Sequence, residues 1–277
     1  MIYLSFFESL LRILDTRTEA SPTLFGWYHI LCLALSVLLT IYLCVFRKND
    51  SPKQIRNVVL ITAIVVTVLE VYKQINYSFT YENGITFSYL WYAFPFQFCS
   101  TPMYVGLLAG LTRKGKVHDA ACAYLATYAI FAGLAVMLYP ADVFNRIIGI
   151  NIQTMVCHGT MLPIGAYLYA TGHVKLQHKT ILKALCVFAV TLLMATIMNE
   201  IAFRNGITDF NMFYISPHCP PHLPVLSIVQ THLPYFWSTL VYIVGFTLVG
   251  YIMLLCAMGI KKLSVLAKSR SRVKTSV

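Results

Sequence analysis

A cysteine and a histidine in apolar surroundings are the residues with the most distinctive chemistry. Cys99 lies in the segment FPFQFCS and His158 in the segment CHG. A thiolate is a strong nucleophile, and a nearby histidine can accept the thiol proton when another polar group holds the imidazole in the useful tautomer. We therefore predict Cys99 as nucleophile and His158 as base, in acyl transfer through a thioester. The alternative is that both residues only pack helices together.

Further polar residues occur inside apolar runs, where each costs a few kcal/mol unless it is paired. The whole set is His29, Glu70, Gln97, Cys99, Asn151, Gln153, His158, Asn199 and Glu200. At a helical rise of about 1.5 Å per residue, Cys99 is about 18 Å and His158 about 15 Å from the outer ends of their helices. We predict one polar cavity that opens outward. In it Glu70, Glu200 or Asn199 orients the imidazole, and Gln97 and His29 support the site.

The same carboxylates allow a second interpretation. Glu70 and Glu200 are suited to a proton or ion site, as in a seven-helix transporter or receptor that uses the same cavity. An inverted repeat between the two halves of the chain, which many transporters have, is not evident.

The elements that must position these residues are membrane helices. The chain has 277 residues, 58% of them hydrophobic and 11% charged, with a mean hydropathy of +0.70. This is too apolar for a water-soluble domain of that length. We predict an all-α, polytopic membrane protein with seven transmembrane helices. The predicted spans are residues 26–46, 58–76, 87–111, 120–138, 148–169, 180–203 and 234–260.

Basic residues give the orientation of these spans. Sixteen of the 21 lysines and arginines follow spans one, three, five and seven. Positive charge is enriched on the cytoplasmic side of membrane proteins. The N-terminus is therefore predicted outside and the C-terminus in the cytoplasm, in either the plasma membrane or an internal membrane.

Three regions follow from this pattern. Residues 1–25 contain Glu8 and Arg12 within an apolar stretch, which predicts an interfacial helix and not a cleaved signal peptide. Residues 26–260 form the transmembrane domain, with a Pro- and His-rich outer loop at 204–233. The polybasic tail, 261–277, is expected to lie in the cytoplasm and to be disordered beyond its first turns.

Cofactors and other partners receive little support from the sequence. The outer loop contains His218, Cys219, His222 and His232, but prolines between them prevent helical ligand spacing, so we predict no metal and no cofactor. The cysteines show no disulfide framework. The net charge of +11 resides in short clusters between apolar runs, which argues against nucleic acid and for a membrane surface.

Several segments together resemble the YwaF family of bacterial integral membrane proteins and its animal relatives. Those segments are WYHI at 27–30, Glu70 followed by YKQI, FPFQFCS at 94–100, CHG at 157–159, MNEIAF at 198–203 and FNMFYISP at 210–217. The core segment is similar to a family pattern of the type LPLHLCS. Its cysteine falls on Cys99, whereas Gln97 replaces the family histidine.

Some of the animal relatives look like cysteine-dependent phospholipid acyltransferases. The resemblance thus implies that Cys99 takes an acyl group from a phospholipid and passes it to a lysophospholipid, with His158 as base. Membrane lipids are the partners that it implies.

Overall fold

The computed structural model describes residues 2–80, 85–219 and 224–274. Most of this part is helical, as predicted. The helices are α1 (Ile2–Leu14), α2 (Trp27–Phe46), α3 (Pro52–Asn76), α4 (Thr101–Leu111), α5 (Lys116–Leu125), α6 (Tyr128–Leu138), α7 (Ile148–Ala170), α8 (Thr180–Arg204), α9 (Pro224–His232) and α10 (Tyr235–Lys274). Short 3-10 turns are η1 (Trp91–Ala93) and η2 (Met212–Tyr214), and β1 (Phe79–Thr80) pairs antiparallel with β2 (Thr86–Phe87).

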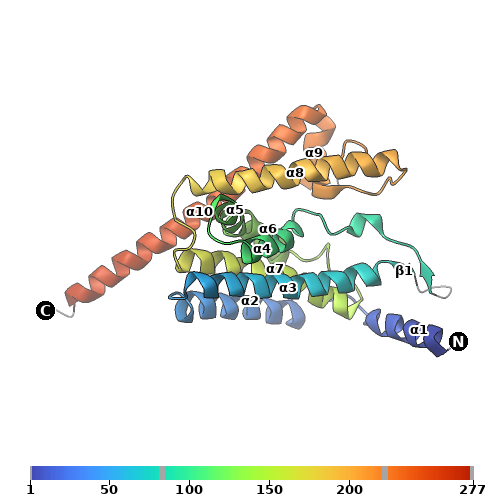
Figure 1. Cartoon of the computed structure of the whole chain (residues 1–277), viewed down its shortest axis with the longest axis horizontal. Helices are drawn as coiled ribbons and strands as arrows, with labels where there is room; N and C mark the ends of the chain where they lie inside the picture. Colours follow the sequence, from blue (N-terminus) through green and yellow to red (C-terminus); the bar gives the residue numbers. More distant parts are fainter. Residues whose placement is uncertain (1, 81–84, 220–223, 275–277) are drawn as a thin grey trace.

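Helix α7 is the centre of the bundle. It packs against α2, α3, α5 and α6 and is buried along most of its length. Helix α8 runs along one long side of the molecule, with α2 and α3 on the opposite side and α4 to α7 between them (Figure 1).

The outer helices expose apolar side chains that a water-soluble protein would cover. Rows of large hydrophobic residues on α2, α3, α8 and α10 remain exposed, whereas α5 and α6 are mostly enclosed. Large exposed apolar faces mark contact with a membrane. In the described residues, five helical segments are long and apolar enough to cross one: Trp27–Phe46, Pro52–Asn76, Lys116–Leu138, Thr180–Arg204 and Tyr235–Ala267.

Glycines allow α7 to lie close to α6 and to the end of α5. A Cβ atom on Gly133 would lie 2.7 Å from the His158 carbonyl oxygen, and one on Gly165 would lie 2.8 Å from the Leu125 carbonyl oxygen. Real Cβ atoms do not come this close to a carbonyl oxygen, so a residue with a side chain would not fit at either position. The backbone of the residue predicted as a base is thus packed directly against α6.

Helix α3 begins earlier than the predicted span because its start carries a capping box. The Ser51 backbone N–H donates to Gln54 Oε1 over 2.8 Å, and the Gln54 N–H donates to Ser51 Oγ over 3.4 Å. Pro52 follows in the first turn, where its missing N–H costs nothing. These polar residues add a first turn that apolarity alone does not reveal.

The predicted span over 87–111 is α-helical only in its second half. This stretch begins with β2, passes through η1 and an irregular segment, and becomes α-helical only at Thr101. Pro95 lies in the irregular segment and Pro102 in the first turn of α4. Since proline removes a backbone donor and restricts the preceding residue, the two prolines confine the helix to the second half of the span.

The predicted helix over 120–138 is also interrupted. Thr127 has φ −129° and ψ −80°, which separates α5 from α6. Its hydroxyl donates to the Ala123 carbonyl oxygen over 2.7 Å and so satisfies one acceptor at the end of α5.

Connections predicted on the same side of the membrane lie at the same end of the bundle. Near the α2–α3 connection, Tyr167 Oη near the end of α7 donates to Asp50 Oδ2 over 2.5 Å. At the other end, the Ile148 N–H at the start of α7 donates to the Thr16 carbonyl oxygen over 3.0 Å.

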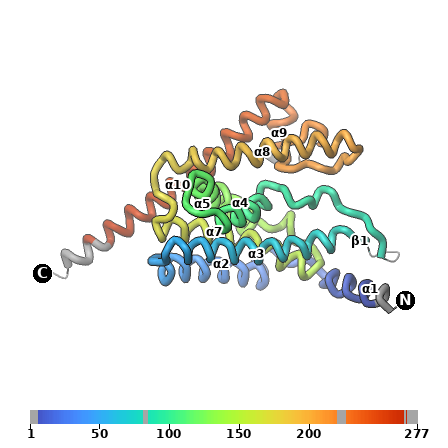
Figure 2. Tube along the Cα trace, in the orientation of Figure 1, coloured from blue at the N-terminus to red at the C-terminus, as the bar shows by residue number. Residues whose placement is uncertain are grey.

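The C-terminal tail differs from the prediction. Helix α10 continues without a break through Lys274, well past the predicted span end at Ile260, and projects from the bundle (Figure 2). Lysine and arginine have good helix propensity, and no proline or glycine interrupts 261–274, so the helix continues in polar sequence.

Candidate functional site

Cys99 lies in the turn that leads into α4. The Ser100 and Thr101 N–H groups donate to the Gln97 carbonyl oxygen, at 2.8 and 3.1 Å, and close this turn. The half-buried Cys99 packs against the hydrophobic core. It directly precedes the first turn of α4.

Thr101 fixes the start of the same helix. Its hydroxyl donates to the Phe98 carbonyl oxygen over 2.8 Å and shares a 2.7 Å hydrogen bond with Tyr124 Oη. Both Thr101 and Tyr124 are fully buried. The turn that carries Cys99 is consequently anchored to α5 and does not depend on loop packing alone.

His158 is buried on α7 with one ring nitrogen bonded and the other free. Nδ1 lies 2.7 Å from the Thr154 carbonyl oxygen, whereas Nε2 has no hydrogen-bond partner in the described residues. Since a carbonyl can only accept, Nδ1 carries the proton in the neutral ring and Nε2 presents a lone pair. The backbone of Thr154 therefore does the orienting that was predicted for Glu70, Glu200 or Asn199.

The thiol and the imidazole lie on elements that meet at one polar cluster, but they are not hydrogen-bonded to each other. Gln153 on α7 donates to Glu70, and Gln74 on α3 donates to the Ala93 carbonyl oxygen in the segment before α4. Because His158 Nε2 has no partner, no direct contact with the thiol is formed in this state.

Glu70 is the centre of that cluster. Its carboxylate pairs with Lys73 Nζ at 2.7 Å and accepts from Gln74 Nε2 and Gln153 Nε2, each at 2.8 Å. Gln74 is in turn bonded to Tyr89 Oη over 2.5 Å. Glu70 is only 5% exposed, so its charge is compensated inside the bundle. The cluster joins α3 to α7 and to the segment before α4.

Gln97 and Asn199 hold a strained loop and do not face an open cavity. Gln97 donates to the Asn211 carbonyl oxygen over 2.8 Å and accepts from the Phe213 N–H over 2.9 Å. Asn199 makes the equivalent pair with the backbone of Met212, at 3.0 and 2.7 Å. Phe213 has φ 60°, an unfavourable conformation for a side chain of this size. The two amides thereby stabilise η2 above the Cys99 turn.

His29 and Glu200 lie apart from the cluster. Buried His29 uses both ring nitrogens, at 3.0 Å from the Phe25 N and 2.7 Å from the Met137 carbonyl oxygen. Glu200 pairs with Arg204 at 2.7 Å. Glu70 is thus buried in the cluster, whereas Glu200 is partly exposed and pairs outside it. The transporter interpretation, which uses both carboxylates, stays a prediction.

The described histidines and the cysteine of the outer loop make contacts within the protein. His218 stacks on Phe203 with ring centroids 3.6 Å apart, and its Nε2 lies 3.0 Å from Glu200 Oε2. Cys219 accepts a hydrogen bond from Asn211 at its carbonyl oxygen. His222 lies outside the described residues, and His232 bonds its own helix at the Ile228 carbonyl oxygen.

An apolar groove begins beside the Cys99 turn. It has a volume of 580 Å³ and runs between α4, α5 and α8, with Phe96 and Thr101 at one end and Cys186 and Val117 farther along. The remaining lining residues are Phe94, Tyr104, Val105, Leu108, Ala120, Val187, Val190, Thr191, Met194 and Met198. The sequence does not predict this groove. Helix α8 is apolar on all sides, so the pattern of its residues does not distinguish a side that lines a groove from a side that faces lipid.

The long apolar helices, their exposed hydrophobic faces and the buried polar cluster define a helical membrane protein. The chain belongs to the TMEM164 family, whose model matches residues 24–258. Neither the search of curated proteins nor the search of solved structures finds a match to the chain. The family match includes all the segments that carry the resemblance to YwaF proteins. That narrower resemblance and its acyltransferase relatives stay a prediction.

Proposed function

We propose that this protein is a multi-pass membrane acyltransferase, in which Cys99 carries the acyl group as a thioester and His158 moves the protons. The observation that carries the proposal is the buried His158 Nε2, which has no partner while Nδ1 is held by a backbone carbonyl. A fixed tautomer with a free lone pair is what a general base requires. A thiol at a helix N-terminus near the same charged cluster supplies the nucleophile.

The proposed topology has seven crossings, with the N-terminus outside and the C-terminus in the cytoplasm. The crossings are α2, α3, the broken segment ending in α4, the pair α5 and α6, α7, α8 and α10. Basic residues follow the first, third, fifth and seventh of these. Cys99 and His158 then lie in the half of the bundle nearer the outer leaflet.

The reaction has two steps. In the first, His158 Nε2 takes the Cys99 proton, the sulfur attacks the ester carbonyl of a phospholipid, and the C–O bond breaks as the lysophospholipid leaves with that proton. In the second, a lysophospholipid hydroxyl gives its proton to His158 and attacks the thioester. The C–S bond breaks, and the thiolate takes the proton back. Each step conserves charge, and no further reactant is required.

The groove supplies a place for the acyl chain. Twelve residues separate Cys186 from Met198 on α8, which at about 1.5 Å per residue is roughly 18 Å, close to the length of a long fatty acyl chain. Its Thr101 end is two residues from Cys99. Phospholipids and lysophospholipids are therefore the proposed donor and acceptor.

Labelling of the purified protein tests the nucleophile. Full-length protein in lipid nanodiscs is incubated with a phospholipid whose acyl chain is isotopically labelled, and peptide mass spectrometry locates hydroxylamine-sensitive acyl groups. We expect the label on Cys99, and its loss in Cys99→Ala and His158→Ala. Cys157→Ala and Cys256→Ala are matched controls, since Cys157 adjoins the histidine and Cys256 is an exposed cysteine on α10. Unchanged labelling and lipid exchange in Cys99→Ala would overturn the proposal.

A second pair of variants tests the groove. Val190→Trp places a bulky ring in the groove, whereas Leu193→Trp adds the same ring to an exposed position on α8 outside it. We expect only Val190→Trp to slow exchange of long-chain donors and to spare short-chain ones. Equal effects of the two variants on all donors would remove the groove from the proposal.

A further inference from the structure

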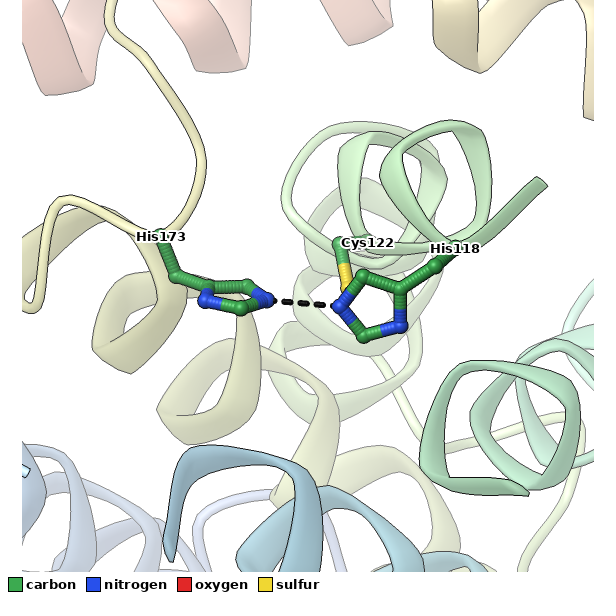
Figure 3. Close-up of side chains that lie close together, drawn as sticks. All are labelled: His118, Cys122 and His173. Atoms are coloured by element: carbon green, nitrogen blue, oxygen red, sulfur yellow. Dashed lines mark hydrogen bonds between the residues drawn. The ribbon is translucent and has the colours of Figure 1, made fainter. Parts of the chain in front are cut away.

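Three metal-ligating side chains converge at the end of the bundle that lies away from Cys99. His118 and Cys122 come from α5, and His173 comes from the connection between α7 and α8 (Figure 3). The two Nε2 atoms are 2.7 Å apart, and Cys122 Sγ is 3.6 Å from His118 Nε2. All three potential ligand atoms lie within 4.8 Å of one another.

Helical spacing and burial set the direction of the first two ligands. Residues four apart lie on one face of a helix, so His118 and Cys122 point to the same neighbour. They are 5% and 2% exposed. His118 Nδ1 lies 3.0 Å from the Ala109 carbonyl oxygen, which assigns the ring proton to Nδ1 and leaves the lone pair on Nε2. Metal-bound histidines usually have such a partner on their second nitrogen.

The cluster holds more donors than acceptors in the absence of a cation. With the His118 proton on Nδ1, both the His173 N–H and the Cys122 S–H are directed at the single lone pair of His118 Nε2. The single lone pair can accept a full hydrogen bond from only one of these two donors. A cation at the point of convergence removes the conflict, because each ligand then offers a lone pair.

The distances also suit a tetrahedral ion. With Zn–N of about 2.05 Å and Zn–S of about 2.3 Å, tetrahedral angles place N and S about 3.6 Å apart and two nitrogens about 3.3 Å apart. The sulfur is already at its distance from His118. The two imidazole nitrogens must separate by about 0.6 Å, and His173 can move because it lies in a connection between helices.

We propose that His118, Cys122 and His173 form a Zn²⁺ site. Binding releases the Cys122 thiol proton to solvent and moves the His173 proton from Nε2 to Nδ1, so that two neutral imidazoles and one thiolate coordinate the ion. The fourth position faces a cavity of 280 Å³ whose lining includes Cys122 and His173, and a water molecule fills that position. Nitrogen and sulfur ligands of this kind favour zinc over magnesium or calcium.

The acidic residue nearest to the proposed site on α5 is already paired. The nearest acid on the same helix, Asp119, lines the cavity but pairs with Lys183 at 2.9 Å. The spacing H-x₃-C at 118–122 was visible in the sequence, but the third ligand is 51 positions beyond Cys122 and only the fold brings it near. The site joins α5 to the α7–α8 connection and does not rest on the proposed acyl transfer.

Metal analysis of the full chain tests the site. The protein is purified with a histidine-free tag, stripped with chelator, dialysed against buffered Zn²⁺ and analysed by plasma mass spectrometry. We expect stoichiometric zinc in the natural chain and near-complete loss in His118→Ala, Cys122→Ala and His173→Ala. His178→Ala and Cys186→Ala are matched controls that keep zinc, since His178 bonds Tyr251 and Cys186 lines another cavity.

Two measurements on the natural chain test the site without relying on variants, which could lose zinc by misfolding. Co²⁺ should give a thiolate-to-metal charge-transfer band, and Zn²⁺ should protect Cys122 from maleimide, as read by peptide mass spectrometry, without protecting Cys256. Failure to retain zinc, absence of the band, or equal alkylation of Cys122 with and without Zn²⁺ would overturn the site and show a plain histidine–histidine hydrogen bond.

Discussion

Glu70 is the buried charge on which the contact of α3 with α7 depends. In Glu70→Ala, Lys73 loses its 2.7 Å partner while its side chain stays only 15% exposed, and Gln153 loses an acceptor. Removing one member of a buried ion pair costs about 3–5 kcal/mol. At about 2–4 °C per kcal/mol, we expect the Tm to fall by roughly 6–20 °C.

A double-mutant cycle separates the ion pair from general packing damage. Glu70→Gln keeps the side-chain shape, and Lys73→Met removes the ammonium but keeps the stem. We expect the double variant to be more stable than the sum of the single losses predicts, by at least about 1 kcal/mol, since no unpaired charge remains buried. Thermal unfolding in detergent micelles, followed by intrinsic fluorescence, measures all four proteins.

An exposed pair provides the control for this cycle. Glu8 and Arg12 are 2.9 Å apart on α1, but their side chains are 47% and 53% exposed. The equivalent substitutions Glu8→Gln and Arg12→Met should each change stability by less than about 0.5 kcal/mol. Additive losses at Glu70 and Lys73, or a loss no larger than at Glu8, would refute the argument that burial makes this pair important.

Two further predictions concern packing and pH. Gly165→Ala should destabilise the protein by about 1–3 kcal/mol because its Cβ would meet the Leu125 carbonyl oxygen. Gly245→Ala, which has open space around it, should be neutral or stabilising by up to about 1 kcal/mol. A Tm comparison checks both variants, and equal shifts would contradict the close approach of α7 to the end of α5. The Arg47 guanidinium, bonded to Asp50 in the α2–α3 connection, lowers the pKa of that carboxyl below its usual range. The ion pair therefore stabilises the fold fully at pH values above the pKa that Asp50 has in the unfolded chain. This stabilisation is lost as the pH falls through the lower pKa that Asp50 has in the folded protein. The Tm difference between the natural chain and Asp50→Asn should therefore narrow below about pH 4, and a difference independent of pH would contradict the ion pair.

The sequence predicted the membrane class and several helix positions well. Helix α2 begins one residue after the predicted span, at Trp27, and α7 begins at the predicted Ile148. Apolar length alone is sufficient for this, because a bilayer demands about 20 apolar residues whatever the neighbours are. The sequence did not predict the polar ends of two helices. At Ser51 a capping box sets the start of α3, and beyond Ile260 helix propensity lets α10 continue, so apolarity does not decide either helix end.

The candidate site was less accessible to such reasoning. Helical rise gave similar depths for Cys99 and His158, but depth does not determine which way a side chain points, since each residue turns about 100°. Long-range partners decide that question. The Thr154 carbonyl took the orienting role, and Gln97 was occupied by the backbone of Phe213. Neither contact has a sequence pattern, because both depend on how separate segments pack.

The length of α10 sets a distance between the membrane and the end of the chain. Its 40 residues extend about 60 Å, whereas a bilayer core is about 30 Å thick. Beyond Ile260 the helix continues for 14 residues, or about 21 Å, as an unbroken rod. A fluorescent protein fused after the last residue would thus be carried clear of the lipid headgroups, and its energy transfer to a membrane dye would report the tilt of this helix.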